Sequence, residues 1–213
     1  MSLNPNALTD YATAKARLRL GNDNDQALIE QLINEASDAL EHFTFRSLSY
    51  APVVTEVVPL KGGPYLLLSR TPVVSVASIT IDELGLIDPS EYVIDDALAG
   101  IIYRDRNWPW SAQLRPDLNF QRDQQPGTEK KNTTVVYAGG YVTGPQATGQ
   151  LPRTLPSDLE RACVVTVVSY YREATRDPNI KQETVGKASR TYVGVDLPEQ
   201  AQELASRYVR WAA

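Results

Sequence analysis

The chain has almost none of the side chains on which disulfide-stabilised and zinc-binding proteins depend. Its 213 residues include one cysteine, Cys163, and one histidine, His42. One cysteine excludes a disulfide within the chain, and one cysteine with one histidine is too few for a Cys/His metal cage. The sequence therefore predicts no structural disulfide and no zinc site, and it favours a reducing compartment.

The chain also lacks an excess of positive charge and a long apolar run. With 21 basic and 26 acidic residues its formal charge is −5, so no global positive surface is predicted for duplex nucleic acid. No run approaches the roughly 18 consecutive apolar residues of a membrane span. Residues 1–6 lack the basic flank and apolar core of a secretory signal. We therefore expect a soluble intracellular chain without a membrane anchor.

Two helices are expected at the N-terminus. Thr9 or Asp10 offers a side-chain oxygen to cap the first, which runs through Leu20 and stops at Gly21. The second covers about residues 25–43 and has the clearest helical periodicity. Its apolar stripe lies opposite an acidic face formed by Glu30, Glu35, Asp38 and Glu41. Because the link between the helices is short, they are predicted to form a hairpin.

Short β-strands dominate the middle of the chain. Runs rich in β-branched or aromatic residues, bounded by proline and glycine, occur at residues 53–58, 65–68, 73–81, 101–103 and 133–137. No helical pattern separates them, which predicts antiparallel strands in a small sandwich or barrel. A long polar loop, residues 105–131, precedes the last strand and contains Trp108-Pro109-Trp110.

Helices return at the C-terminus. Ser157 and Glu160 have the spacing of a capping box, in which the serine and the glutamate each bond a free backbone amide at the helix start. The helix that follows, to about Arg172, is apolar nearly all round, so it is predicted to be the central one. After weak strand or loop character near residues 188–192, a last helix starts at about Leu197.

These elements predict an α+β fold. The N-terminal helical hairpin and the C-terminal helices are expected to form one bundle, with an inserted antiparallel β sandwich or small barrel. The expected divisions are residues 1–50 for the hairpin, residues 51–150 for the β-rich region with its Arg/Trp loop, and residues 151–213 for the remaining helices.

We find no catalytic, cofactor-binding or metal-binding constellation in the sequence. His42 lies on a helix beside acidic residues, and Cys163 lies in an apolar helical run where a thiol behaves as a small hydrophobe. The pairs Gly62-Gly63 and Gly139-Gly140 lack the spacing of a phosphate-binding loop and are interpreted as turns. The sequence predicts neither an enzymatic activity nor a cofactor.

Arginine and tryptophan gather in and beside the long polar loop. The residues concerned are Arg104, Arg106, Trp108, Trp110, Arg115 and Arg122. This combination suits protein interfaces or backbone phosphates. The alternative is a solvated loop with an aromatic side chain tucked into the barrel.

Several motifs occur in an order that points to one family. They comprise residues 8–20, residues 25–33, Thr44-Phe45-Arg46, residues 68–76, Trp108-Pro109, residues 135–141, residues 155–162 and Tyr170-Tyr171-Arg172. Their shared order resembles the head-tail connector (adaptor or head-completion) proteins of long-tailed bacteriophages, including longer variants in prophages and gene transfer agents. The stretch after Asp177 is covered least. Phe45 departs from the family, which commonly has glycine at that place.

The resemblance implies a non-enzymatic virion subunit at the head-tail junction, present in the host bacterial cytoplasm during assembly. Such a subunit assembles as a ring beneath the portal protein, extends the DNA channel without sequence-specific binding, and meets the next head-completion or tail protein. Isolated subunits of this kind are compatible with a monomeric state, because interface loops can order on docking.

A closed ring needs two different complementary patches on each subunit. The acidic residues Glu35, Asp38 and Glu41 and the arginine-rich loop are the candidate pair of opposite charge. We expect charge reversal of the three acidic residues to impair assembly while the monomer stays folded.

Three other functions are compatible with the sequence. The first is a tail-completion or tail-terminator protein, which shares the mixed composition. The second is an enzyme or ligand-binding β-domain with a site between the barrel and Trp108–Trp110, although the convergent titratable groups that it requires are missing. The third is a stand-alone bacterial interaction module of prophage origin.

Overall fold

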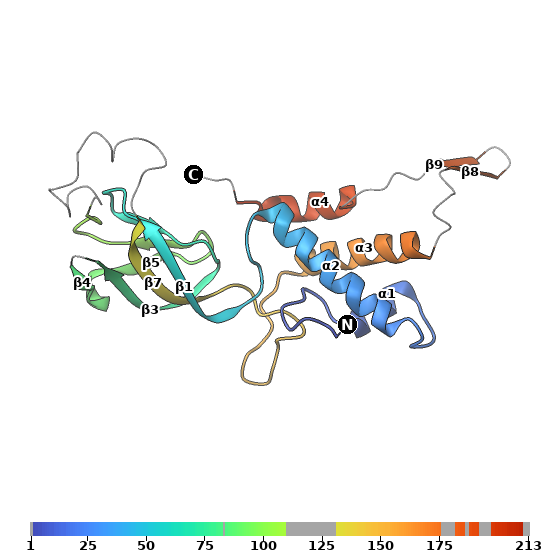
Figure 1. Ribbon diagram of the computed structural model, residues 1–213, viewed down its shortest axis with the longest axis horizontal. Coiled ribbons are helices and arrows are strands. Elements are labelled where there is room, and N and C mark those ends of the chain that lie inside the picture. The colour runs from blue at the N-terminus through green and yellow to red at the C-terminus, as the bar shows by residue number, and fades with distance from the viewer. Residues whose placement is uncertain are drawn as a thin grey trace. The chain divides into compact units, whose positions relative to one another are not determined.

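The chain folds into two compact units. A computed structural model describes residues 2–82, 84–109, 131–175, 182–185, 188–191 and 197–210. One unit, here called the helical unit, comprises Met1–Ser49 and Val142–Ala213, and the other, the β unit, comprises Tyr50–Tyr141 (Figure 1). The described residues combine helices with antiparallel sheets, which confirms the predicted α+β class.

Most of the helical unit consists of helices from both ends of the chain. They are α1 (Tyr11–Leu18), α2 (Gln26–Thr44), α3 (Ser157–Ala174) and α4 (Glu199–Ala205), with a 3-10 turn at Ser206–Tyr208. A two-stranded hairpin, β8 (Gln182–Val185) with β9 (Ala188–Thr191), comes between α3 and α4 in the sequence. The strand character predicted near residues 188–192 corresponds to β9.

The ends of the first two helices follow local backbone chemistry. Asp10, rather than Thr9, caps α1, because its Oδ1 accepts a 2.7 Å bond from the backbone N–H of Thr13. The helix ends at Leu18, before the predicted Leu20, because Arg19 adopts the left-handed conformation with φ 59°. The predicted apolar stripe of α2 is its buried face, formed by Ile29, Leu32, Ile33, Ala36 and Leu40.

The third helix contacts α1, α2 and α4, so the N-terminal pair of helices packs on it as predicted. Its buried residues are Leu159, Ala162, Cys163, Val164, Thr166 and Val167. The predicted capping box is wrong. Ser157 is already the first helical residue and Pro156 occupies the cap position, so the serine stands one place too late for the box. Glu160 instead accepts a 2.7 Å bond from Arg153.

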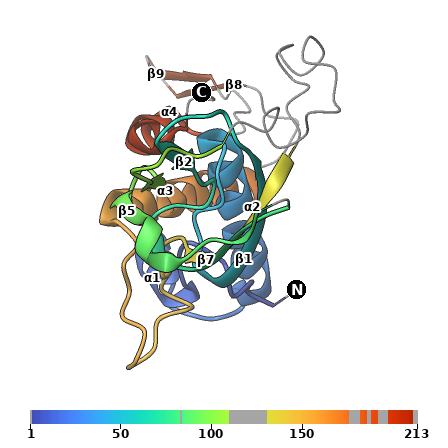
Figure 2. The same cartoon turned by 90° about the vertical axis from the view of Figure 1, so that its left-hand side faces the viewer.

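The β unit contains two antiparallel sheets (Figures 1 and 2). One has the strand order β1-β7-β3-β4, with β1 at Ala51–Pro59, β7 at Lys131–Gly139, β3 at Val73–Ile81 and β4 at Gly85–Leu86. The other has the order β2-β6-β5, with β2 at Tyr65–Leu67, β6 at Ile101–Tyr103 and β5 at Val93–Asp96, which follows a 3-10 turn at Pro89–Glu91. All five predicted strands are present, whereas β4 and β5 were not predicted.

Both sheets contribute to one hydrophobic core. It includes Val58, Ile79, Ile81 and Val135 from the first sheet, Leu66 and Ile102 from the second, and Trp108 from the segment after β6. Face-to-face packing of two sheets is the sandwich arrangement. The two strands that were not predicted, β4 and β5, are short, and all their residues are exposed. Neither segment has the alternation of apolar and polar residues that predicts a half-buried strand.

Candidate assembly interface

The described residues hold no obvious catalytic centre. No group of three or more histidine, cysteine, aspartate or glutamate side chains comes together there in a way that could hold a metal ion. His42 is exposed in the last turn of α2, and Cys163 is fully buried with its Sγ 3.7 Å from Ser37 Oγ. In the same described part of the chain, no helix is long and apolar enough to span a membrane.

Cys163 is expected to make the protein less stable in mild alkali. Burial raises the pKa of its thiol from 9.0 to about 12. Above pH 9 the unfolded chain loses this proton while the folded chain keeps it, so the free energy of unfolding falls, by at most about 1.4 kcal/mol per pH unit. Urea unfolding at pH about 8 and about 9.5 measures this slope, and Cys163→Ala should reduce it. An equal slope in both proteins would contradict the prediction.

The predicted acidic face of α2 is divided between surface and structural side chains. Glu35 and Asp38 are exposed, and Glu35 accepts a 2.8 Å bond from Gln31 Nε2. Glu41 is only half-exposed. Its Oε1 accepts bonds from the backbone N–H groups of Leu48 at 2.7 Å and Ser49 at 3.3 Å. The sequence-based assignment of Glu41 to an interface is therefore corrected, because its carboxylate holds the chain that leaves α2.

Two residues of the predicted arginine-rich loop, Arg104 and Trp108, are also structural. Trp108 is 2% exposed and belongs to the core of the β unit, as in the alternative of an aromatic side chain tucked into the barrel. Arg104 is 8% exposed, forms an ion pair with Glu91, and has its guanidinium 5.3 Å from the centre of the Trp108 ring. We therefore remove Arg104 and Trp108 from the predicted interface.

Of the other predicted residues of this loop, one is exposed and three lie outside the described residues. Arg106 is exposed and still available for contact. Trp110, Arg115 and Arg122 lie outside the described residues. Burial of Trp108 could not be inferred from its neighbours in the sequence, which are mostly polar or charged. It depends on the backbone oxygens of Gly63 and Pro64, which accept from the Trp108 backbone N–H at 2.7 Å and its indole Nε1 at 3.1 Å.

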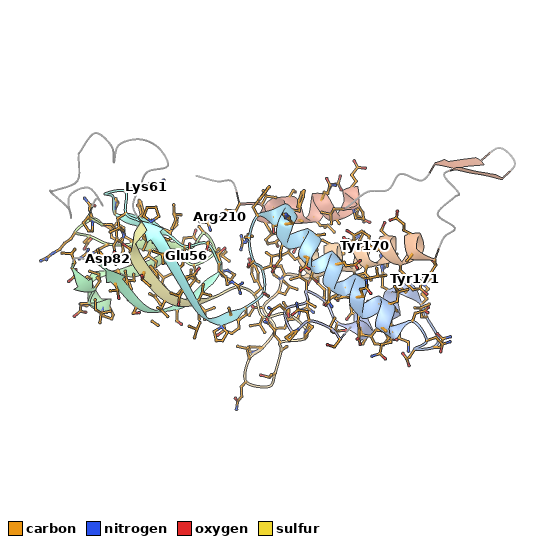
Figure 3. The ribbon with its side chains drawn as sticks, viewed as in Figure 1. Glu56, Lys61, Asp82, Tyr170, Tyr171 and Arg210 are labelled. Carbon is orange, nitrogen blue, oxygen red and sulfur yellow. The ribbon has the colours of Figure 1, made fainter. Side chains whose placement is uncertain are left out.

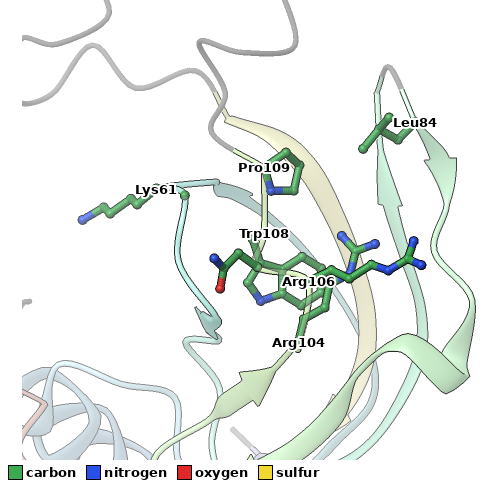
Figure 4. Close-up of a pocket in the computed structure, with 8 residues that line it drawn as sticks. Lys61, Leu84, Arg104, Arg106, Trp108 and Pro109 are labelled. Carbon is green, nitrogen blue, oxygen red and sulfur yellow. The ribbon is translucent and has the colours of Figure 1, made fainter.

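An open hollow of about 670 Å³ lies beside Trp108 in the β unit (Figure 4). Its described lining consists of Lys61, Gly62, Leu84, Arg104, Arg106, Asn107, Trp108 and Pro109. None of these residues is a carboxylic acid, a histidine or a cysteine, so this lining supplies no pair for general acid–base catalysis. The hollow lies where the enzyme alternative placed its site, and its described lining does not provide that chemistry.

A second hollow, here called the α2–α3 groove, lies on the helical unit and has a volume of about 420 Å³. Its described lining is Leu32, Glu35, Tyr170, Glu173 and Ala174. Leu32 is buried, whereas Glu35 and Glu173 are exposed. The groove thus combines apolar side chains with two carboxylates.

Tyrosine hydroxyl groups bond the link between α1 and α2 to the neighbouring helices. The hydroxyl of Tyr171, beside Tyr170 near the end of α3, donates a 2.6 Å bond to Asp25 at the start of α2 (Figure 3). The hydroxyl of Tyr11 and the ammonium of Lys15 both donate to Asp23 Oδ1, each at 2.6 Å. The bond to Asp23 raises the pKa of Tyr11 to about 12. These contacts join the link between α1 and α2 to α1 and to α3.

Comparison with known proteins gives matches among solved structures. No protein-family model and no curated protein matches the chain. A chain from the neck of an empty gene transfer agent particle matches with a TM-score of 0.57 and 16% identity, over 100% of this chain and 94% of the other. This chain has that chain's fold. A chain from the virion of a native gene transfer agent particle matches over the same shares, with a TM-score of 0.56 and 16% identity.

Proposed function

We propose that this chain is a structural neck subunit of a phage-like particle: a head-tail connector that assembles as a ring on the portal protein and meets a neighbouring head-completion or tail protein. The main support is the length of the match with a gene transfer agent neck chain, which covers 100% of this chain and so includes both units. The order of motifs over residues 8–172 is independent support. In this role the protein is part of the virion and DNA passes through its ring without sequence readout.

The described surfaces fit an assembly role better than a catalytic one. The larger hollow has no acid–base pair in its described lining, whereas Glu35 and Asp38 on α2 and Arg106 in the β unit present exposed charges of opposite sign. A ring requires two different patches that complement each other between neighbours. We assign Glu35 and Asp38 of α2 to one of these patches.

Charge reversal separates the interface residues of α2 from the structural one. Glu35→Lys with Asp38→Lys is expected to weaken ring assembly about tenfold or more and to change the free energy of unfolding by only about 0.5 kcal/mol. Glu41→Lys is expected to cost about 1–3 kcal/mol, because the N–H groups of Leu48 and Ser49 lose their acceptor. Urea unfolding and light scattering measure the two effects. Normal rings from the Glu35/Asp38 variant would contradict the assignment.

The proposed function is tested by size-exclusion chromatography with light scattering. The full chain is run alone and mixed with portal rings from the same phage or prophage. Co-elution as a closed ring on the portal is the expected result. A chain that ignores portal rings at every salt concentration but binds tail tubes would overturn the connector role and favour a tail-completion or tail-terminator protein.

A further inference from the structure

The residue that ends α2 breaks two local rules of stability. Phe45 adopts the left-handed conformation with φ 54° and ψ 34°, and its side chain is 75% exposed, more than that of any other large hydrophobic residue described. The N–H groups of Phe45 and Arg46 donate to the carbonyl oxygens of His42 and Glu41, each at 3.3 Å. This is the Schellman pattern of helix ends, in which glycine normally takes the place of Phe45.

Neither the left-handed backbone of Phe45 nor the exposure of its side chain stabilises the monomer. A side chain with a Cβ in this conformation is strained, and a bulky one is a real outlier. An exposed phenyl ring gains little from burial and presents apolar surface to water. Arg19 ends α1 in the same conformation, with φ 59°, but its side chain is exposed and charged. Sequences that break a local rule without a gain in the fold often do so for function, and Phe45 breaks two.

The α2–α3 groove fits a protruding aromatic side chain. Its volume of about 420 Å³ lies in the lower part of the range of small-ligand sites, about 300–1,000 Å³. Leu32, Tyr170 and Ala174 give it apolar contact surface, and Glu35 and Glu173 give it negative charge. An aromatic side chain inserted into such a pocket is a common hot spot of protein interfaces.

The charges near Phe45 complement those of the groove. Arg210 lies close to Phe45, because its backbone N–H donates a 3.0 Å bond to the carbonyl oxygen of Thr44 (Figure 3). A positive charge beside the aromatic residue and glutamates in the groove attract each other across a contact and set its orientation.

We propose that Phe45 of one copy docks in the α2–α3 groove of the next copy in the ring. This contact rests on the proposed function and specifies how neighbouring subunits meet. Phe45 and Glu35 are ten residues apart on and beyond α2, about 15 Å at the rise of a helix, so the two patches are distinct. A patch that meets a different patch on its neighbour makes a heterologous contact, which is the type that builds a ring.

The first test replaces Phe45 by glycine. Phe45→Gly removes the phenyl group and relieves the strain of the left-handed backbone. The melting temperature should therefore rise by about 2–4 °C, while association between copies should fall at least about tenfold. Arg19→Gly is the matched control, because it relieves the same strain at the end of α1. It should raise the melting temperature and leave association unchanged. Sedimentation velocity measures association, alone and on portal rings.

The second test blocks the α2–α3 groove and leaves Phe45 intact. Ala174 is exposed at the end of α3, so Ala174→Trp should fill the groove without loss of the fold. Each variant alone should fail to form rings. Mixed in equal amounts they should form a one-to-one dimer and nothing larger, because only the intact Phe45 of one and the intact groove of the other can meet.

The possible results separate this contact from the proposed function. If the wild-type chain forms rings and Phe45→Gly does so equally well, the contact is overturned and the connector role stands. The contact is likewise overturned if the wild-type chain forms rings but the mixed variants stay monomeric. If the wild-type chain forms no ring, alone or on the portal, both proposals are overturned together.

Discussion

Replacement of Trp108 by alanine is expected to lower the free energy of unfolding of the β unit by about 3–5 kcal/mol. The side chain is 2% exposed in the core, and its ring centre lies 6.4 Å from that of Tyr92 and 5.3 Å from the Arg104 guanidinium. Its loss would leave a cavity, remove the cation–π contact and deprive the Pro64 carbonyl oxygen of its indole donor. Urea unfolding followed by far-ultraviolet circular dichroism measures the change.

Two further variants show whether the aromatic side chain of Trp108 or the nearby charge of Arg106 stabilises the β unit. Trp108→Phe keeps much of the apolar volume and should lose about half as much stability as Trp108→Ala. Arg106→Ala removes an exposed neighbour that lines the same hollow and should change the free energy of unfolding by no more than about 0.5 kcal/mol. A loss below about 1 kcal/mol for Trp108→Ala would show that the ring does not belong to the core.

Long periodic segments could be predicted from the sequence. The stripe of α2 has helical spacing, so its buried face could be predicted from that spacing. The strands β1 and β3 could be predicted from their β-branched residues, although Val53 and Val57 of β1 and Val74 of β3 are exposed. Asp10 was one of two predicted caps, because a cap acts within one turn. The order of helices, strands and helices also led to the α+β class.

Contacts between distant segments could not be predicted in this way. Trp108 looks like a loop residue among arginines, and its core contacts and its bonds to Gly63 and Pro64, 44 or more residues earlier, become visible only in the folded chain. Glu41 lies on the acidic side of its helix by periodicity, yet backbone groups seven and eight residues later bind its carboxylate. Phe45 departs from a family pattern in the sequence, but its left-handed backbone and the α2–α3 groove proposed to receive it are visible only in the folded chain.

Gly139→Ala, which adds one methyl group, is expected to lower the free energy of unfolding of the β unit by about 3 kcal/mol. This glycine ends β7, where it pairs with Ala51 of β1 and Val73 of β3. A Cβ there would lie 2.6 Å from the carbonyl oxygen of Arg70 and 3.2 Å from that of Pro72. Both atoms belong to the backbone, so the strain cannot be relieved by a side-chain rotation.

The same methyl group would disturb a partly buried hydrogen-bond network. It would lie 3.1 Å from the ring of Tyr137, whose hydroxyl donates a 2.7 Å bond to Glu56 and accepts a 2.9 Å bond from the Arg70 backbone N–H. Partial burial and the carboxylate of Glu56 raise the pKa of Tyr137 to about 12, in keeping with a neutral, bonded hydroxyl. A displaced ring weakens these bonds in addition to the steric strain.

Gly63→Ala is the matched control for Gly139→Ala. A Cβ at Gly63, in the turn before β2, would have no atom within 4 Å, so the free energy of unfolding should change by no more than about 0.5 kcal/mol. Urea unfolding of both variants, followed by far-ultraviolet circular dichroism, gives the comparison. Equal stability would mean that β7 can move away from the 70–72 segment. A large loss at Gly139 alone would show that close backbone approach, rather than turn flexibility, requires glycine there.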